Sequence, residues 1–323
     1  MKKTILLLGI FATFLFSCKR NNIPENIDFK QEMRNFVQGI SSYARSTNSN
    51  FIIIPQNGSE LSTENGTENG TPAATYLNAI DGQGQEDLFY GYDSDDRETS
   101  QNDTEYLKNY LDIEKNNNVK ILVTDYCSTH SKMDNSYQKN NTSGYISFAA
   151  PERNLNVIPD YPSDPYNVNT NDITSLSDAK NFLYLINPEK FSSKQDFINA
   201  VSQTNYDVVL MDLFFNDTQE FSASEISALK TKANGGKRLV ISYMSIGEAE
   251  DYRYYWKSEW DKDKPEWLDK ENPNWKGNYK VWYWEKEWQN IIFGNDSSYL
   301  KKILNAGFDG VYLDIIDAFD YYE

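Results

Sequence analysis

The sequence predicts an α/β protein built as a (β/α)8 barrel of the TIM type. Apolar runs typical of buried parallel strands alternate with segments of helical periodicity. Eight such runs are strong, starting near residues 51, 76, 120, 182, 207, 238, 280 and 309, and a weaker ninth covers 145–150. The 323 residues suffice for one large domain of this kind. A doubly wound sheet is the alternative, but the chain has no Gly-x-Gly-x-x-Gly turn and no Walker sequence.

The first residues have the pattern of an export signal. Lys2 and Lys3 precede an apolar run, residues 5–16, that is too short to span a bilayer. The run ends in Leu-Phe-Ser-Cys18, which resembles a bacterial lipobox. Residues 1–17 are therefore predicted to be a lipoprotein signal peptide, with Cys18 as the lipidated first residue and 18–27 as a tether. An ordinary signal peptide or an uncleaved anchor is the alternative.

The first half of the remaining chain opens with a helix. Residues 28–45 have apolar side chains at helical spacing, and Asp28 is available as the N-cap. A strand at 51–57 ends at Asn57-Gly58, and the repeated Thr-Glu-Asn-Gly unit marks a low-complexity loop at 59–75. The pattern then predicts a strand at 76–81, a polar turn at 82–87, a helix at 103–116 and a strand at 120–126.

The second half begins with residues 151–180, which hold four prolines and little periodicity and are predicted to be a connector. Ser222 and Glu225 form a capping-box pattern at the start of one helix, and Gly235-Gly236 ends it. The predicted elements are strands at 182–186, 207–213, 238–244, 281–284 and 311–316, and helices at 192–203, 222–234 and 287–306, the last interrupted near Gly294. The chain stops at Glu323 without a helix after its last strand.

Composition excludes several classes of function. The formal net charge is −17, with 48 acidic against 31 basic residues, which argues against a nucleic-acid groove. A single histidine, His130, leaves little material for a Ser-His-Asp triad or a multi-histidine metal site. We expect no cofactor, no metal and no nucleic-acid partner, and we expect a monomer.

Carboxylates recur where the predicted strands end. These residues are Asp81, Asp125, Asp212, Glu248 and Asp314. Strand ends of a barrel converge on one mouth, and paired carboxylates with aromatic walls are the machinery of glycosidic bond cleavage. Residues 255–289 hold all seven tryptophans, of which Trp256, Trp260, Trp267 and Trp275 lie among charges. Such rings can stack on sugars or pack a loop over the rim, and we expect about half to be packing only.

Several long motifs resemble glycoside hydrolase family 114. They include Ser245-Ile-Gly-Glu-Ala-Glu-Asp-Tyr-Arg253, Asn272-Pro-Asn-Trp275, Trp282-Tyr-Trp284, Gly307-Phe-Asp-Gly-Val-Tyr-Leu-Asp314, Phe51-Ile-Ile-Ile-Pro-Gln-Asn-Gly58 and Ile80-Asp-Gly-Gln-Gly-Gln-Glu86-Asp87-Leu-Phe-Tyr90. The resemblance covers most of 28–150 and 181–323. It implies a TIM-type barrel and an endo-α-1,4-polygalactosaminidase-like activity on a polysaccharide.

The order of these motifs departs from the family. The Pro-Gln-Asn-Gly and Glu-Asp-Leu-Phe-Tyr segments follow Gly-Val-Tyr-Leu-Asp in the family but precede it here. A circular permutation explains this order: the chain would start at the helix after family strand five and end on strand five. Residues 28–323 would then form one barrel, with 151–180 joining the family's usual termini. A truncated chain is the alternative.

The resemblance carries the family's two catalytic acids onto Asp314 and Glu86, with Asp87 competing for the second assignment. It implies Asp314 as nucleophile and Glu86 as general acid/base in a retaining mechanism, or the exchanged roles. Residues expected to line the substrate site are Asp212, Tyr243, Glu248, Asp251, Tyr283, Asp317, Asn57 and Asp87. A non-catalytic carbohydrate-binding lipoprotein on the same barrel is the second hypothesis. In both cases we expect an exported protein, lipid-anchored in the bacterial cell envelope.

Overall fold

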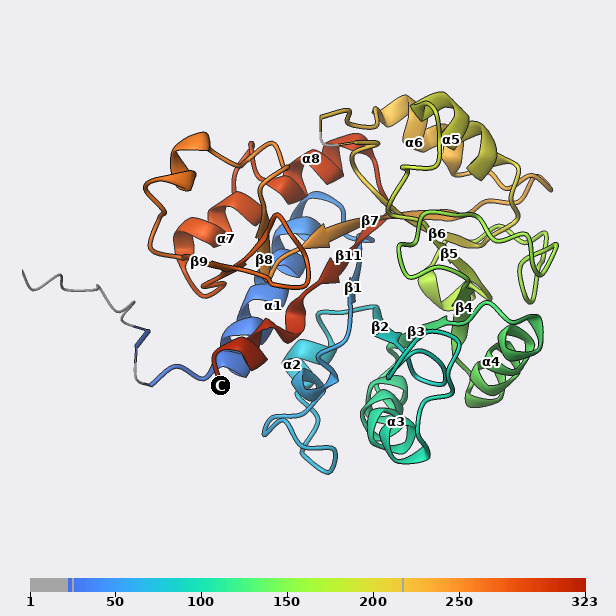
Figure 1. Ribbon diagram of the computed structural model, residues 1–323, viewed down its shortest axis with the longest axis horizontal. Helices are drawn as coiled ribbons and strands as arrows, with labels where there is room; N and C mark the ends of the chain where they lie inside the picture. The colour runs from blue at the N-terminus through green and yellow to red at the C-terminus, as the bar shows by residue number, and fades with distance from the viewer. Residues whose placement is uncertain (1–22, 25, 217) are drawn as a thin grey trace, which may run out of the picture.

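The computed structural model describes residues 23–323 apart from 25 and 217. The described residues contain eight strands that pair only in parallel: β1 (Ile52–Pro55), β2 (Gly82–Glu86), β3 (Lys120–Tyr126), β4 (Ile146–Ala150), β5 (Phe182–Tyr184), β6 (Val208–Asp212), β7 (Leu239–Ser245) and β11 (Gly310–Asp314). The α-helices are α1 (Phe29–Thr47), α2 (Ala74–Leu77), α3 (Gln101–Asn116), α4 (His130–Ser143), α5 (Lys194–Ser202), α6 (Ala223–Leu229), α7 (Lys286–Ile292) and α8 (Tyr299–Ala306). The helices lie around the strands (Figure 1). The predicted α/β class with parallel strands is confirmed.

The parallel strands form two sheets, one of five strands in the order β1-β11-β7-β6-β5 and one of three in the order β2-β3-β4. The sheets approach each other at both edges. Beyond β1, Gln56 forms a parallel bridge with Gly84 of β2, and the Asn57 amide donates to the Gly84 carbonyl at 2.8 Å. At the other edge Phe148 of β4 packs on Phe182 of β5, with ring centroids 6.0 Å apart. The carboxyl ends of the strands therefore share one end of the molecule.

The first helix and the C-terminal end of the chain are neighbours. Asp28 caps α1 as expected, because its carboxylate accepts from the Gln31 amide at 2.9 Å. Lys30 forms an ion pair with Glu323, and the rings of Phe29 and Tyr322 lie 5.8 Å apart. Figure 1 shows the C-terminus beside the start of α1. Strand β1 pairs directly with β11, so the two ends of the described chain meet in space.

The predicted strand at 76–81 is wrong. Residues Ala74–Leu77 form the short helix α2, and the strand is Gly82–Glu86, inside the predicted polar turn. Gln83 and Gln85 are buried although they are polar. The Gln83 amide donates to the Asn57 carbonyl at 2.7 Å, and the Gln85 amide donates to the Glu86 carbonyl at 2.8 Å. These bonds replace the apolar burial that a strand pattern normally signals.

The glycine at position 84 is a second reason why β2 lacks an apolar sequence. A Cβ at this position would lie 2.0 Å from the Tyr312 hydroxyl of β11. Tyr312 is fully buried, so only glycine leaves room for this core side chain. A residue chosen for close approach contributes no hydrophobic signal, which is why the sequence pattern concealed the strand.

The predicted strand near 280 also needs correction. Asn278–Val281 forms β10, which pairs antiparallel with β8 (Glu248–Glu250) and β9 (Leu268–Glu271) in a separate small sheet. Trp282, Tyr283 and Trp284 follow it outside any strand. The weaker candidate at 145–150 is instead one of the parallel strands, β4, and all five of its residues are buried.

Several helices differ from their predicted extents. The predicted helix at 287–306 is two helices, α7 and α8, separated around Gly294, which has a left-handed φ of +100°. The Ser222–Glu225 capping box is present, but α6 ends at Leu229. Helix α4 was not predicted because few of its residues are apolar; it begins at His130, whose ring stacks on Tyr161 at 3.8 Å.

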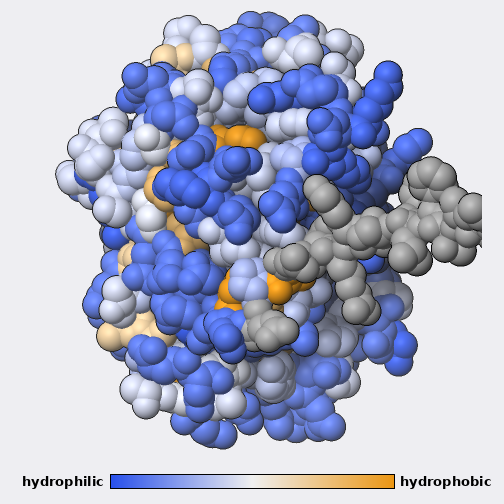
Figure 2. Space-filling view, turned by 90° about the vertical axis from the view of Figure 1, so that its left-hand side faces the viewer, coloured by the Kyte–Doolittle hydropathy of each residue, from blue (hydrophilic) through white to orange (hydrophobic). Residues whose placement is uncertain are grey.

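The core follows the strands, and the face of the surface seen in Figure 2 is mainly polar. Each of the eight parallel strands is buried along most of its length, which accounts for the apolar sequences of all of them except β2. The face in Figure 2 is mainly hydrophilic, with small separate hydrophobic patches, consistent with the excess of acidic residues. Within the part of the chain that the structure describes, no helix is long and apolar enough to cross a membrane. The predicted signal peptide and Cys18 lie outside that part.

Candidate active site

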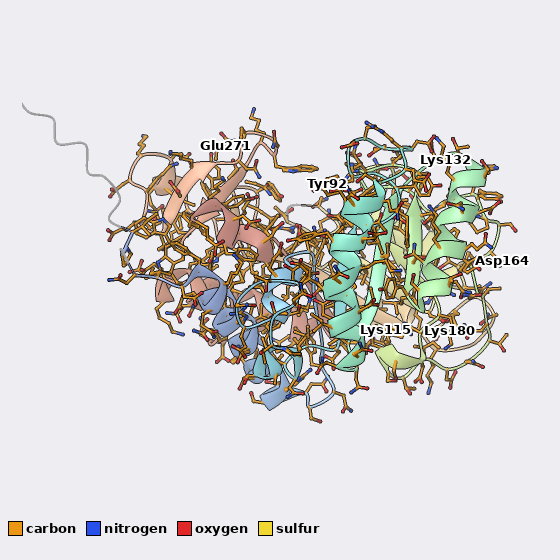
Figure 3. All side chains as sticks on the ribbon, turned by 90° about the horizontal axis from the view of Figure 1, so that it is seen from below. Tyr92, Lys115, Lys132, Asp164, Lys180 and Glu271 are labelled. Carbon is orange, nitrogen blue, oxygen red and sulfur yellow. The ribbon has the colours of Figure 1, made fainter. Side chains whose placement is uncertain are left out.

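A cavity of about 550 Å³ lies at the carboxyl ends of the parallel strands. Strand residues that line it are Glu86, Tyr126, Tyr184, Asp212, Tyr243 and Asp314, from β2, β3, β5, β6, β7 and β11. In Figure 3 this end of the molecule is marked by Tyr92 and Lys132, which follow β2 and β3. Lys115 and Lys180, which precede β3 and β5, mark the opposite end. The volume of the cavity lies in the range of ligand pockets.

Asp314 is held at the end of β11 by two donors. The Tyr243 hydroxyl donates to its Oδ2 at 2.7 Å, and the Ile315 amide donates to its Oδ1 at 2.9 Å. Burial and the nearby charge of Glu86 raise the pKa of Asp314 to about 7, although the Tyr243 hydrogen bond opposes this shift. The carboxyl group is therefore partly protonated near neutral pH, which suits proton-transfer chemistry.

Glu86 ends β2 and reaches the same cavity. The Tyr126 hydroxyl donates to its Oε1, and the Asn57 amide donates to its Oε2 at 3.1 Å. The Asn57 side chain also accepts from the Glu86 backbone amide at 3.1 Å, so it contacts both the carboxylate and the backbone of Glu86. Among the described residues, neither Glu86 nor Asp314 forms an ion pair.

The chain turns sharply where it enters the cavity. Asn57 after β1, Asp87 after β2 and Ile315 after β11 all have left-handed φ values of about +60°. This conformation is tolerated by Asn and Asp but costs energy for a β-branched residue such as Ile315. The strained turn at Ile315 places its amide on Asp314 and puts its side chain in the cavity wall.

A second acidic group in the cavity is neutralised. Arg253 donates to both carboxylate oxygens of Asp212, at 3.0 and 2.6 Å, and its Nε donates to Glu250 at 2.7 Å. All three residues are at least nine-tenths buried. Burial raises the pKa of Asp212, and the Arg253 charge opposes that shift. The arrangement indicates a structural ion-pair network, because each carboxylate has a cationic partner.

Glu248 and Asp317 complete the acidic lining. Glu248 is fully buried and accepts from Asn272 at 2.8 Å, from Asn278 at 3.3 Å and from the Tyr321 hydroxyl at 3.1 Å. Burial and the neighbouring Asp320 raise the pKa of Asp317 to about 7. The cavity is thus strongly acidic on the side of Asp314.

Three residues predicted for the site do not line the cavity. Asp87 forms an ion pair with Arg153 at 2.9 Å, and burial raises its pKa to about 6 against the effect of that partner. Asp251 is exposed, beside Gly277. The Tyr283 hydroxyl donates to the Phe29 carbonyl at 2.9 Å and so supports the start of α1. The structure thus places Glu86, and not Asp87, in the cavity wall.

Two of the five strand-end acids lie elsewhere. Asp81 precedes β2, because the strand is shifted from its predicted position, and it accepts from the Ile53 amide at 2.8 Å and pairs with Arg45. Asp125 is fully buried and accepts from the Phe89 and Tyr90 amides and from Ser136. The carboxylates of both residues are bonded to protein partners, so their role is to fix loops and not to bind a ligand.

Among the four tryptophans considered for sugar stacking, Trp275 alone lines the cavity. It lies between β9 and β10 with 55% of its surface exposed. Trp260 and Trp267 are buried against each other with ring centroids 5.1 Å apart, and Trp256 packs on Trp260 at 5.2 Å. Three of these rings therefore pack the segment that covers this side of the molecule.

The prediction missed Tyr126, Tyr184, Gln56, Asn278, Arg253 and Arg153, all of which line the cavity. Tyr126 and Gln56 stand at or just after strand ends, a positional signal that could have identified them. Arg153 and Arg253 gave no such signal, because one lies in the irregular connector and the other in a turn. Within the described ranges, no group of three or more His, Cys, Asp or Glu side chains could hold a metal ion.

Comparison with known proteins gives one family. The model of glycoside-hydrolase family GH114 matches residues 168–322. An uncharacterized protein of Methanocaldococcus jannaschii is 40% identical over 48% of this chain and 42% of its own length. An uncharacterized protein of Thermotoga maritima is 39% identical over 38% of this chain and 36% of its own length. The crystal structure of Aspergillus fumigatus Ega3 with galactosamine matches with a TM-score of 0.27 and 27% identity, over 36% of this chain and 39% of that chain. The matches thus span about two fifths of each of these proteins.

Proposed function

We propose that this chain, whose residues 168–322 match the model of glycoside-hydrolase family GH114, cleaves a galactosamine-containing polysaccharide with Asp314 and Glu86 as its catalytic pair. The observation that carries the proposal is that both carboxylates line one cavity, each oriented by a tyrosine hydroxyl and neither neutralised by a described cation. Glycosidic bond cleavage needs one such group as an acid and the other as a base or nucleophile.

We assign Asp314 as the nucleophile and Glu86 as the acid/base. Glu86 would protonate the leaving oxygen while Asp314 attacks the anomeric carbon, and Glu86 would then activate the water that releases the sugar. In the free protein the raised pKa of Asp314 leaves that residue partly protonated near neutral pH. A cationic sugar bound beside Asp314 favours the ionised form that attacks the anomeric carbon. The retaining course requires the two carboxyl groups to be about 5–5.5 Å apart in the complex.

Azide separates this assignment from the exchanged one. In a variant that lacks the acid/base, azide attacks the glycosyl-enzyme and restores turnover with retained configuration. We expect a glycosyl azide of retained configuration from Glu86→Ala and one of inverted configuration from Asp314→Ala, where azide takes the place of the missing nucleophile, measured with a galactosaminide that carries a good leaving group. A retained product from Asp314→Ala and an inverted one from Glu86→Ala would exchange the roles.

The acidic lining supports a cationic substrate. Asp314, Asp317, Glu248 and Glu86 bring several carboxylates to one side of the cavity, whereas Arg253 neutralises only the other side. Protonated galactosamine units would be attracted to such a site, and neutral N-acetylated units would not.

The deciding experiment is a screen of galactosamine-containing polymers of defined N-acetylation, with product anomers followed by NMR. We expect cleavage that increases with the fraction of free amine and α-anomers as first products. Absence of cleavage of all such polymers by the folded protein would contradict the proposed substrate. Binding of the same polymers without any cleavage would instead favour the non-catalytic carbohydrate-binding protein.

We also propose that the two parallel sheets make one (β/α)8 barrel whose chain order is circularly permuted. The pairing of β1 with β11 and the ion pair between Lys30 and Glu323 support this order, as does the adjacency of the sheets at Gln56–Gly84 and at Phe148–Phe182. A chain that starts at Asn181, joins Glu323 to Asp28 through a short linker and ends at Lys180, so that Arg153 is kept, should fold and keep its activity. Failure of this rearranged chain to fold would count against the permutation.

Export and lipidation at Cys18 remain proposals that rest on the sequence. Labelling of the expressed full chain with a radioactive fatty acid tests them. Label in the wild type that is lost in Cys18→Ala would support a lipid anchor in the cell envelope, and an unlabelled wild type would contradict it.

A further inference from the structure

Arg153 connects three separate parts of the chain beside the cavity. It lies three residues after β4, in the irregular segment 151–180 that the sequence suggested was only a connector. Its guanidinium donates to both oxygens of Asp87, at 2.9 and 3.2 Å, to the Gly91 carbonyl at 3.0 Å and to Asp95 at 2.7 Å. This planar, forked group thereby fixes the loop that follows β2.

The same guanidinium covers the ring of Tyr126. The distance from its central carbon to the ring centroid is 3.8 Å, which is a close cation–π contact. Tyr126 ends β3, is only 2% exposed, and donates its hydroxyl to Glu86. Asp87, the other main partner of Arg153, is the next residue in the chain after Glu86. Arg153 is therefore linked to Glu86 in two ways, through the ring of Tyr126 and through the neighbouring residue Asp87.

From this geometry we propose that Arg153 is a positioning residue, which orients Glu86 for proton transfer through Tyr126 and Asp87. The proposal rests on the function proposed above. It gives the segment 151–180 a role in the site, because this segment supplies the group that joins the ends of β2 and β3.

An ordinary ion pair would behave differently. The Arg153 side chain is 37% exposed, and Asp95 is 52% exposed. Ion pairs with this exposure contribute little to folding stability. A residue that served only such pairs could be replaced without any change in the dependence of the reaction on its leaving group.

The leaving group supplies the discriminating test. An alkoxide leaving group needs a proton from Glu86, whereas 2,4-dinitrophenolate departs without one. We therefore compare Arg153→Met with the wild type on a galactosamine oligosaccharide and on the corresponding 2,4-dinitrophenyl glycoside. Arg97→Met is the matched control, since Arg97 pairs with Asp93 on the same loop and is 65% exposed. Arg153→Lys retains the charge but not the fork.

We expect Arg153→Met to lower kcat/KM, which reports the glycosylation step, by roughly 10- to 100-fold on the oligosaccharide and to change kcat/KM on the activated glycoside by less than about 3-fold. Arg153→Lys should fall between Arg153→Met and the wild type, and Arg97→Met should equal the wild type. In a Tyr126→Phe background the effect of Arg153→Met should shrink, because the path to Glu86 is already interrupted. Equal losses on both substrates, or losses that add fully to those of Tyr126→Phe, overturn the proposal.

The two proposals can fail separately. If the wild type cleaves the oligosaccharide and Arg153→Met does so equally well, only the role of Arg153 is wrong. If the wild type cleaves no substrate, the proposed function fails, and crystal structures of both proteins decide the positioning role. Loss of the Tyr126–Glu86 contact in Arg153→Met supports it, and an unchanged contact contradicts it.

Discussion

Asp212 and Asp314 both end a buried parallel strand and both line the cavity, but their surroundings differ. Asp212 receives both arms of Arg253, which also binds Glu250. Asp314 receives a tyrosine hydroxyl and one backbone amide, and the neighbouring charge that most affects its pKa is that of another carboxylate, Glu86. Position at a strand end therefore does not identify a reactive acid. Between these two residues, the cationic partner distinguishes the neutralised acid from the one that is left to react.

The largest expected effect follows from removing the unpaired acids. Glu86→Gln and Asp314→Asn keep the shape of each side chain but remove proton exchange and nucleophilic attack. Each should lower kcat by at least about 10²- to 10⁴-fold, measured by reducing-end release from the polymer. Asp212→Asn is the contrasting variant. If it lowers kcat as much while its unfolding midpoint is unchanged, the distinction between the two acids fails.

The next effect concerns folding stability on the neutralised side. Arg253→Met leaves Asp212 and Glu250 buried without a cation, and should lower the free energy of unfolding by about 3–5 kcal/mol. Urea denaturation followed by tryptophan fluorescence measures this loss. Lys237→Met, which breaks an exposed pair with Asp172, is the control and should stay within about 0.5 kcal/mol of the wild type. A loss for Arg253→Met no larger than that of the control would show that the network is not structural.

Asp314 should destabilise the fold as the pH rises. Its pKa is raised from 3.8 to about 7 in the folded protein, so the folded state binds the proton more tightly than the unfolded state. The favourable contribution of the protonated group is complete below about pH 4 and is lost as the pH rises through 7. Asp314→Asn should match the wild type near pH 4 and be more stable at pH 8 by on the order of 2–4 kcal/mol. Urea titrations at both pH values measure this, and an equal gain at both would contradict the shifted pKa.

The smallest expected effect lies at the cavity mouth. Trp275 is exposed and has no part in the charge networks, so Trp275→Ala should weaken substrate binding and leave the chemistry intact. We expect KM to rise by about 5- to 10-fold with kcat changed less than about 2-fold, which corresponds to the loss of one stacked ring. Trp260→Ala, by contrast, should lower stability because that ring is buried. A fall in kcat for Trp275→Ala would assign this residue to the reacting centre.

Sequence reasoning succeeded where the physical signal is local. The apolar runs that became β3, β6, β7 and β11 are buried on both faces, and such strands carry a nearly continuous hydrophobic pattern. The caps at Asp28 and Ser222 depend on neighbouring residues only, and both are present. Asp314 was recognised as a candidate because it follows such a run, and it lies within the segment that the family model matches.

Sequence reasoning failed where the signal depends on residues far away in the chain. Strand β2 is made of Gly and Gln, because Gly84 must admit Tyr312 and Gln83 must reach the Asn57 carbonyl. Its shift by several residues moved Asp81 from the active end to the opposite end. The choice between Glu86 and Asp87 had the same origin, since the left-handed turn at Asp87 directs that residue to Arg153.

By itself, the sequence determined the parallel α/β class, the caps of its helices and the set of acids from which a site could be made. Only the tertiary structure decided which of these acids are neutralised and which are not. The physical reason is that hydrophobic periodicity and capping act over a few residues, whereas the partner of a carboxylate is chosen by folding. Arg253 reaches Asp212 from 41 residues away, and Tyr243 reaches Asp314 from 71.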